Sequence, residues 1–439
     1  MGAKKPIVAI VGRQNVGKST LLNRLAGKPI AIVDDFPGTT RDRILASVSC
    51  PGGEFTIVDT GGLELRPDSA MAEGVNEQVE TAIREADVII FLLDVRDGVM
   101  PADLEIADSL RKIGKPVVLI ANKADNAKYE SRAVEFYQLG LGEPLAISAY
   151  HGRGIAEMLD EITRLLPVPS LVEPEPEAIK VAIVGRPNVG KSTLLNAILG
   201  DERAIVDDIP GTTRDAIDTL FDFEGESVLL IDTGGIRRRG RVKGGVERYS
   251  VIRALRAIDR ADIALLVLDA AELVTAQDMH VAGYIRQASK GIVLLVNKWD
   301  LVEAGSTADF SRYVKGHFKF VAYAPVLYTS ARLGGGVDKI MPQVLKIYQE
   351  RLKRLPTAVV NSVIQRAVAA HSLPRRGSLQ LKILYVTQAE VNPPTFVFFV
   401  NDPQLVHFSY QRYLENRLRQ SFGFAGTPVR FVFKARGEQ

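Results

Sequence analysis

Two strings of the sequence combine glycines, a lysine and a serine at the spacing that holds a chain of phosphates. The first consists of Gly12, Arg13, Gln14, Asn15, Val16, Gly17, Lys18 and Ser19, followed by Thr20. The second consists of Gly185, Arg186, Pro187, Asn188, Val189, Gly190, Lys191 and Ser192, followed by Thr193. Both fit G-x-x-x-x-G-K-[ST], and each follows a strand-like run and precedes a helix-like one, as that motif requires.

The residue types of these strings suit a nucleoside triphosphate with Mg²⁺. Glycines let successive backbone N–H groups turn inward, and the N-terminus of the following helix adds positive potential. Lys18 and Lys191 are predicted to reach the β and γ phosphates, and the hydroxyls of Ser19 and Ser192 to coordinate Mg²⁺. The same spacing disfavours a dinucleotide site of the Rossmann type, which has no use for the lysine and serine.

Two later strings carry side chains that distinguish guanine from adenine. They read N-K-x-D, and they are Asn122, Lys123, Ala124 and Asp125 in the first half and Asn297, Lys298, Trp299 and Asp300 in the second. The carboxylate can accept hydrogen bonds from guanine N1–H and its exocyclic amine, whereas adenine would leave it unpaired at a large cost. The lysine stems can lie along the base. About one helix later, backbone N–H groups are available at Ser148, Ala149, Ser330 and Ala331. GTP and GDP are therefore the expected ligands.

The motifs recur in the same order, which indicates a duplicated domain. The phosphate strings lie 173 residues apart, as do Asp59, Thr60, Gly61 and Gly62 from Asp232, Thr233, Gly234 and Gly235. The N-K-x-D strings lie 175 residues apart, and the Ser-Ala pairs 182 residues apart. The offset grows only through loop insertions, so each half is predicted to form a complete nucleotide-binding unit.

Apolar runs between the motifs indicate the elements that position them. Strands are expected at 7–11, 88–94, 117–121, 263–269 and 292–296, and amphipathic segments separate them. Continuous Val, Ile and Leu runs are typical of strands buried on both faces. Alternation with helices predicts an α/β fold with a mostly parallel sheet and flanking helices in each half.

The pattern changes twice along the chain, which sets the domain boundaries. We expect one nucleotide-binding domain at 1–167, an acidic Pro/Glu linker at 168–178, a second such domain at 179–353 and a small basic domain at 354–439. In the last domain a helix is expected at 359–370, strands at 379–387 and 396–400, a helix at 409–422 with Ser409 as its N-cap, and a strand at 429–433.

Charge separates these regions. Residues 1–170 have 19 Lys and Arg against 24 Asp and Glu, whereas residues 351–439 have 13 against 4 and a net charge of +9. A basic region of this kind indicates a polyanionic partner. The single cysteine, Cys50, excludes an intrachain disulfide and fits a reducing compartment, and no apolar run is long enough to span a membrane. We therefore expect a cytoplasmic protein without a membrane partner.

The order of these motifs, given twice and followed by a short basic domain, closely resembles the Der (EngA) family, the bacterial double-Era-like GTPases of the translation-factor class. The resemblance covers nearly the whole chain and implies two tandem Ras-like P-loop G domains followed by a KH-like α+β domain. It implies that Thr40 and Thr213 ligate Mg²⁺ only in the GTP state. It also implies that Asp59 and Asp232 hold Mg²⁺ through water, and that Gly62 and Gly235 contact the γ-phosphate through backbone N–H.

Both halves lack a side chain that could orient the water that attacks the γ-phosphate. Ras-type enzymes orient the attacking water with a glutamine, but Leu63 and Ile236 occupy that place and cannot bond water. Slow basal turnover is therefore expected. The resemblance suggests a K⁺ ion, with Asn15 and Asn188 as its ligands, that offsets the charge developing on the phosphates. The alternative is that these asparagines only brace the loop.

The family resemblance also implies a partner, ribosomal RNA in a large-subunit (50S) assembly particle, and we expect a monomer that does not bind DNA. The last domain has no G-x-x-G loop, because Gly377 lacks a second glycine, and it therefore departs from the pattern of an RNA-clamping KH domain. The alternative phosphate contacts are Arg375, Arg376, Lys382, Arg412, Arg417, Arg419 and Arg430. Phe396, Phe398 and Phe399 are better explained as core residues than as a stacking surface. A run of arginines at 236–243 occurs in the second half only. It has two interpretations: a contact with RNA or a neighbouring domain that depends on the bound nucleotide, or simply a solvated surface.

Two other functions remain open at this level. One is a tRNA-modification or membrane-trafficking GTPase, although no extra catalytic cysteine, cofactor site, lipid anchor or membrane helix supports it. The other makes one G domain a structural module that binds GTP without hydrolysing it; both motif sets are intact, so only variants of single sites decide.

Overall fold

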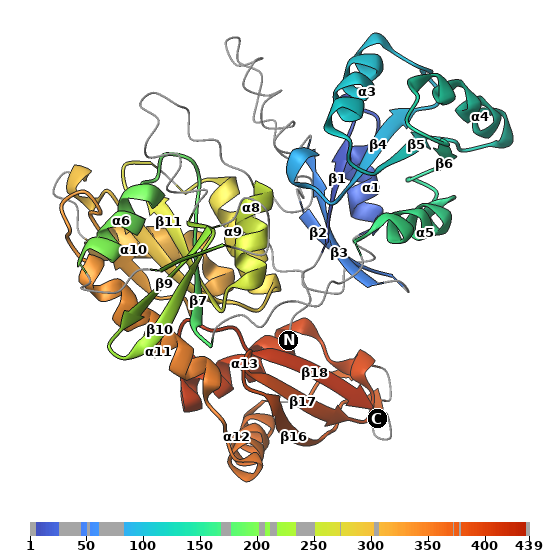
Figure 1. Cartoon of the computed structure of the whole chain (residues 1–439). Helices are drawn as coiled ribbons and strands as arrows, with labels where there is room; N and C mark the ends of the chain where they lie inside the picture. Colours follow the sequence, from blue (N-terminus) through green and yellow to red (C-terminus); the bar gives the residue numbers. More distant parts are fainter. Residues whose placement is uncertain are drawn as a thin grey trace. The chain divides into compact units, whose positions relative to one another are not determined.

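The structure is a computed structural model of the 439-residue chain. It describes residues 6–25, 45–50, 53–60, 83–167, 177–201, 207–210, 217–233, 251–272, 274–302, 307–371, 373–376 and 379–435. The chain forms two compact units, Met1–Pro174 with Arg248–Arg253, and Glu175–Glu247 with Ala254–Gln439. Figure 1 labels their elements along the chain.

A six-stranded sheet forms the centre of the first unit. Its order is β2-β3-β1-β4-β5-β6, and only the β2–β3 pair is antiparallel. The strands are β1 (Ile7–Val11), β2 (Leu45–Cys50), β3 (Gly53–Asp59), β4 (Val88–Asp94), β5 (Val117–Asn122) and β6 (Leu145–Ala146). The helical segments are α1 (Lys18–Leu25), α3 (Pro101–Ile113), α4 (Ala127–Ser131), the 3₁₀ segment η2 (Arg132–Leu139) and α5 (Ile155–Leu165). All residues of β1 and β4 are buried, as their unbroken apolar runs predict.

The second unit repeats this architecture in a seven-stranded sheet of order β13-β12-β11-β7-β10-β9-β8. Its strands are β7 (Ile179–Val184), β8 (Asp207–Pro210), β9 (Ile217–Phe223), β10 (Glu226–Ile231), β11 (Ile263–Asp269), β12 (Gly291–Asn297) and β13 (Val326–Tyr328). Its helices are α6 (Lys191–Asp201), α8 (Val251–Arg260), α9 (Ala276–Gln287), α10 (Thr307–His317) and α11 (Ile340–Leu352), with 3₁₀ segments η3 (Trp299–Leu301), η4 (Lys319–Val321) and η5 (Val337–Lys339). The predicted α/β class is confirmed.

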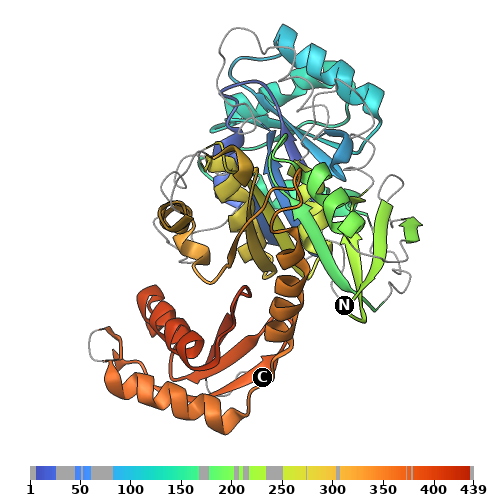
Figure 2. The ribbon, with the colours of Figure 1, turned by 90° about the vertical axis from the view of Figure 1, so that its left-hand side faces the viewer.

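The basic C-terminal region belongs to the second unit and has its own core. It contains α12 (Thr357–Ala370), the short strands β14 (Arg375–Arg376) and β15 (Leu379–Gln380), then β16 (Ile383–Glu390), β17 (Thr395–Val400), η6 (Pro403–Leu405), α13 (Phe408–Phe422) and β18 (Arg430–Ala435). β16 and β17 are antiparallel, and β17 and β18 are parallel. Apolar residues of both helices and of the sheet share one core. Figure 2 shows α12 in orange and α13 in red beside these strands.

Two details of this region differ from the sequence-based expectations. The expected strand 379–387 is broken at Leu381 and Lys382, because the Leu381 N–H donates to the carbonyl of Pro374 and the Lys382 N–H donates to the side chain of Asn401. Ser409 is not the N-cap of α13. His407 is, because its Nδ1 accepts from the Ser409 N–H at 3.3 Å, and the helix begins one residue before Ser409.

None of the helices in the described part of the chain is long and apolar enough to cross a lipid bilayer.

Candidate guanine-nucleotide sites

In each of the two nucleotide-binding domains, those predicted site residues that the structure describes gather at the carboxyl ends of the parallel strands. The first phosphate loop joins β1 to α1, and the second joins β7 to α6. The last residues of the neighbouring strands lie side by side, Asp94 opposite Asn122 and Asp269 opposite Asn297. Ligands bind at this edge of open α/β sheets, so the fold brings the separate motifs to one place.

The second glycine of each phosphate loop is required by both backbone angle and space. Gly17 has φ +101° and Gly190 has φ +96°, a region that favours glycine. A Cβ added at Gly17 would lie 2.5 Å from Nδ2 of Asn122, and one at Gly190 would lie 2.3 Å from Nδ2 of Asn297. These close approaches explain why the loop and the N-K-x-D string must carry these residue types together.

Those two asparagines tie the phosphate loop to the base loop. The Asn122 amide donates to the carbonyl of Val16 at 2.8 Å and accepts from the Ala149 N–H at 3.0 Å. Asn297 makes the matching bonds to Val189 and Ala331 at 2.8 and 3.0 Å. Both side chains are almost fully buried. The N–H groups of Ala149 and Ala331, which were expected to meet the guanine oxygen, therefore donate to these asparagine side chains in the structure.

The phosphate-loop lysines lie across the mouths of their own loops. The Lys18 ammonium donates to the carbonyls of Gly12 and Arg13 at 2.6 and 2.9 Å, and Lys191 donates to the carbonyl of Arg186. Each lysine is less than a tenth exposed. A polyphosphate in the loop would exchange these neutral acceptors for charged ones, which bind an ammonium more strongly.

Two oxygen groups that were predicted to hold Mg²⁺ lie together in the first site. The Ser19 hydroxyl donates to Oδ2 of Asp59 at 2.8 Å, and Asp59 is 1% exposed at the end of β3. A hydroxyl and a carboxylate beside a phosphate loop fit Mg²⁺, which prefers oxygen and takes the rest of its shell from phosphates and water. In the second site Asp232 has φ +58°, and its N–H donates to Oδ1 of Asp218 at 2.8 Å.

The carboxylates expected to recognise guanine are oriented by the serines of the Ser-Ala pairs. The Ser148 hydroxyl donates to Oδ1 of Asp125 at 2.6 Å, and Ser330 donates to Oδ1 of Asp300 at 2.5 Å. The Ser148 hydrogen bond, with that of Arg96, lowers the pKa of Asp125 despite partial desolvation. Asp125 is therefore ionised at neutral pH, and an ionised carboxylate is the acceptor that guanine N1–H and its amine require.

Sequence reasoning missed the two aspartates that end β4 and β11. Asp94 accepts from the Lys123 ammonium at 2.5 Å, and Asp269 accepts from Lys298 at 2.6 Å. Lys123 also donates to the carbonyl of Asn15 at 2.8 Å. The charged heads are thus held at the strand ends, which leaves the stems to flank a base. A repeated Asp after an apolar run, at the offset of the N-K-x-D strings, was the available signal.

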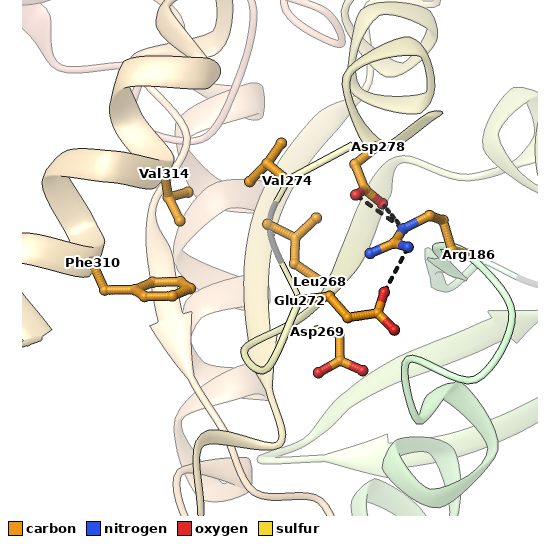
Figure 3. A pocket seen from close by; sticks show the side chains of 8 residues that line it. All are labelled: Arg186, Leu268, Asp269, Glu272, Val274, Asp278, Phe310 and Val314. Atoms are coloured by element: carbon orange, nitrogen blue, oxygen red, sulfur yellow. Dashed lines mark hydrogen bonds and ion pairs between the residues drawn. The ribbon is translucent and has the colours of Figure 1, made fainter. Parts of the chain in front are cut away.

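The arginine inside each phosphate loop is also tied down. Figure 3 shows Arg186, whose Nε donates to both oxygens of Asp278 at 3.0 Å and whose Nη1 donates to Glu272 at 2.8 Å. Asp278 is 1% exposed at the start of α9. The pocket in Figure 3 is lined by Arg186, Leu268, Asp269, Glu272, Val274, Asp278, Phe310 and Val314, so it borders the loop without including Lys191.

In the first site, the arginine of the phosphate loop contacts the corresponding aspartate less closely. Arg13 donates to Asp97 at 2.6 Å, but its Nε lies 3.5 Å from Oδ1 of the buried Asp103. Burial raises the pKa of Asp103, and the Arg13 hydrogen bond lowers that of Asp97. The contrast with Arg186 and Asp278 is visible only in the tertiary structure.

The other predicted residues of the strings lie as follows. Asn15 and Asn188 have φ values of +65° and +62°, a conformation that asparagine tolerates better than most residues. Trp299 packs against Tyr328 and Phe310, with ring centroids 4.5 and 5.3 Å apart. Four of the remaining residues are exposed: Gln14, Thr20, Asn188 and Thr193. Pro187 is half-buried, and Ala124 is buried. Thr60 donates to the carbonyl of Ile10 at 2.7 Å, and Thr233 bonds Thr219 at 2.7 Å.

Several predicted residues lie outside the described part of the chain. They are Thr40, Gly61, Gly62, Leu63, Thr213, Gly234, Gly235, Ile236 and the arginine run at 236–243.

Replacing Asn297 with alanine is expected to weaken guanine-nucleotide binding at the second site by about 10- to 100-fold. The change leaves the buried carbonyl of Val189 and the N–H of Ala331 without their amide partner, at about 1–3 kcal/mol for each group. Titration with GDP measures the effect, and Asn122→Ala should act in the same way on the first site. Asn401→Ala, far along the chain in the C-terminal region, is the control. An unchanged affinity for GDP in Asn297→Ala would contradict the claim that Asn297 holds the phosphate loop and the base loop together for nucleotide binding.

Comparisons with known proteins agree with this geometry. The family model described as "50S ribosome-binding GTPase" matches residues 7–123 and 180–298, and the model described as the C-terminal KH-domain-like region of EngA bacterial GTPase enzymes matches 354–434. Curated relatives named GTPase Der come from Geobacillus thermodenitrificans, 49% identical over 98% of this chain and 99% of its own, and from Thermomicrobium roseum, 51% identical over 98% and 96%. A third, from Desulfitobacterium hafniense, is 50% identical over 99% of both chains. This chain is a GTP-hydrolysing enzyme and belongs to the Der family of GTPases.

Proposed function

We propose that this chain is a GTP-driven switch that contacts ribosomal RNA during assembly of the large ribosomal subunit. The observation that carries the proposal is the pairing of two guanine-nucleotide sites with a KH-like region of net charge +7 at residues 354–434 of the same chain. The family model that matches both G domains is described as 50S ribosome-binding, which points to the same partner. Thr40, Thr213, Gly62 and Gly235 are the residues that we expect to sense the γ-phosphate.

The KH-like region offers aromatic and basic groups on the face of its sheet that lies away from its helices. Phe396 and Phe398 are buried in the core shared with α12 and α13, as expected from the sequence. Alternation along β17 turns Phe399 to the opposite face, where it stacks on Tyr385 with ring centroids 4.4 Å apart and planes at 6°. Lys434 of β18 lies opposite Phe399 in register. Stacked rings beside a cation suit an unpaired RNA base and its phosphate.

Co-sedimentation with large ribosomal subunits tests this function. We expect binding with a non-hydrolysable GTP analogue to exceed binding with GDP, because a switch must make different contacts in its two states. Tyr385→Ala combined with Phe399→Ala should weaken binding about 10-fold or more, given about 1–3 kcal/mol for each stacked base. Leu384→Ala is the matched control, since Leu384 is 44% exposed and Tyr385 46%. Binding that is equal in both nucleotide states would reject the switch.

We further propose that K⁺ stimulates hydrolysis through the carboxamides of Asn15 and Asn188. GTP turnover should be faster in KCl than in NaCl at matched ionic strength. Asn15→Gly and Asn188→Gly keep a backbone that accepts positive φ while they remove the carboxamides, so the difference between the salts should shrink. If the asparagines only brace the loop, turnover in the glycine variants will respond to the two salts as the parent does.

The two halves are proposed to divide the work. The first G domain regulates, and the second works with the C-terminal region. Backbone bonds support the second half of this proposal, because the Ile292 N–H donates to the carbonyl of Gly426 and the Gly426 N–H donates to the carbonyl of Tyr323, both at 2.8 Å.

A further inference from the structure

The base-reading carboxylate of the first site already carries a cation. Oδ1 of Asp125 accepts from Ser148, and Oδ2 accepts from the guanidinium of Arg96. The two side chains remain in contact with water, at 50% exposure for Arg96 and 20% for Asp125. Guanine presents two donors on this edge, N1–H and the exocyclic amine, and therefore needs both carboxylate oxygens.

Neighbouring groups hold Arg96 in this position. Its N–H donates to Oδ1 of Asp94 at 3.0 Å, and its carbonyl accepts from Arg132 at 3.2 Å. Its guanidinium lies 5.7 Å from the centroid of the Tyr129 ring, within the range of a cation–π contact. The backbone at the end of β4 thus aims this side chain at Asp125.

The second site has the same backbone and no such cation at this position. Ala271 takes the place of Arg96, as its N–H donates to Oδ1 of Asp269 at 2.9 Å, the counterpart of the Arg96–Asp94 bond. Among residues that the structure describes, the recorded partner of the Asp300 carboxylate is the Ser330 hydroxyl. The duplicated sites therefore differ at the one group that recognises the base.

We propose that Arg96 competes with guanine for Asp125, so that the first site binds guanine nucleotides more weakly and releases them faster than its motifs alone would allow. The proposal rests on the assignment of Asp125 as the base-reading residue in the proposed function. Binding of the base requires the Arg96–Asp125 pair to open. Exposed ion pairs are weak, so the expected effect is about two- to five-fold in affinity.

The test removes the cation from one site and installs it in the other. In an Asp300→Asn background, the amide at 300 meets the guanine amine donor to donor, so a GDP titration reports the first site. Arg96→Ala should then lower the dissociation constant about two- to five-fold and slow GDP release, and the gain should shrink in high salt, which screens exposed pairs. In an Asp125→Asn background, Ala271→Arg should weaken GDP binding at the second site by a similar factor.

Arg153→Ala is the matched control, because Arg153 donates to the backbone carbonyl of Asp125 at 3.0 Å and leaves the carboxylate oxygens alone. Its loss removes a positive charge near the same loop and should not tighten GDP binding. Weaker or unchanged binding in Arg96→Ala would overturn the proposal, the first outcome showing that Arg96 assists the base. Failure of the site assignment is distinguishable, because Asp125→Asn would then leave the preference for GDP over xanthosine diphosphate intact.

Discussion

Lys18→Ala and Lys191→Ala, made in separate chains, are each expected to abolish most GTP turnover at one site and leave the other working. Each lysine is buried at the mouth of its phosphate loop, where it donates to loop carbonyls. Its ammonium is expected to contact the β and γ phosphates. Loss of one such preorganised donor lowers the rate by about 10²–10³, so the residual turnover of each variant measures the opposite site.

Phosphate release at saturating GTP gives this measurement, and GDP titration shows whether the damaged site still binds. Lys112→Ala and Lys346→Ala, exposed lysines of the first and second units, serve as controls that should keep the parent rate. Partial losses that together account for the parent rate mean that both sites hydrolyse. If one variant alone loses all turnover, the domain that remains intact in it binds GTP without hydrolysing it.

Arg351→Ala is expected to lower the free energy of unfolding of the second unit by about 3–5 kcal/mol, from lost packing and unpaired acceptors. Arg351 lies in the last turn of α11, the helix before the C-terminal region, and is 2% exposed. It donates to Asn392 at 2.9 Å, to the Thr427 hydroxyl at 3.1 Å and to the carbonyl of Ser289 at 3.2 Å. Alanine would leave these three acceptors unpaired and open a cavity among them.

Burial also lowers the pKa of Arg351 to about 10, so keeping this cation desolvated has a cost of its own. Arg351→Met, which preserves volume without the charge, should therefore destabilise less than Arg351→Ala. Urea unfolding followed by the fluorescence of Trp299, the single tryptophan, reports on this unit. Arg366→Ala, at an exposed position of α12, should stay within about 0.5 kcal/mol of the parent. Equal stability of Arg351→Ala and the parent would show that the three acceptors find other partners.

Local chemistry explains how much of the candidate sites could be predicted. A glycine needed at positive φ, a lysine and a serine at fixed spacing, and a carboxylate after N-K-x are neighbours along the chain, so their arrangement is largely a property of the local backbone. Gly17 illustrates this, with the φ of +101° that the motif requires. The buried strands were equally predictable, because an unbroken apolar run such as Val88–Asp94 is stable only where both of its faces are buried, as in the centre of a parallel sheet.

Contacts between distant residues explain what could not be predicted. Asn122 was expected to meet the nucleotide, and the structure shows its amide joining Val16 to Ala149, each far from it in sequence. Phe398 and Phe399 are adjacent and alike, yet strand pleating sends one to the core and the other to the open face. Ser409 was expected to cap α13, but the helix begins at Phe408 and His407 caps it.

The sequence by itself determined that this chain has two GTP sites of the same chemistry, because each motif is short and repeats in order. Only the tertiary structure decided that the two sites differ. Arg96 donates to Asp125, which lies 29 residues away in sequence, and Arg186 donates to Asp278, which lies 92 residues away. Arg13, in contrast, lies 3.5 Å from Asp103. Such pairs depend on where strands and helices end in space, and no local sequence pattern determines the distance between the two side chains of a pair.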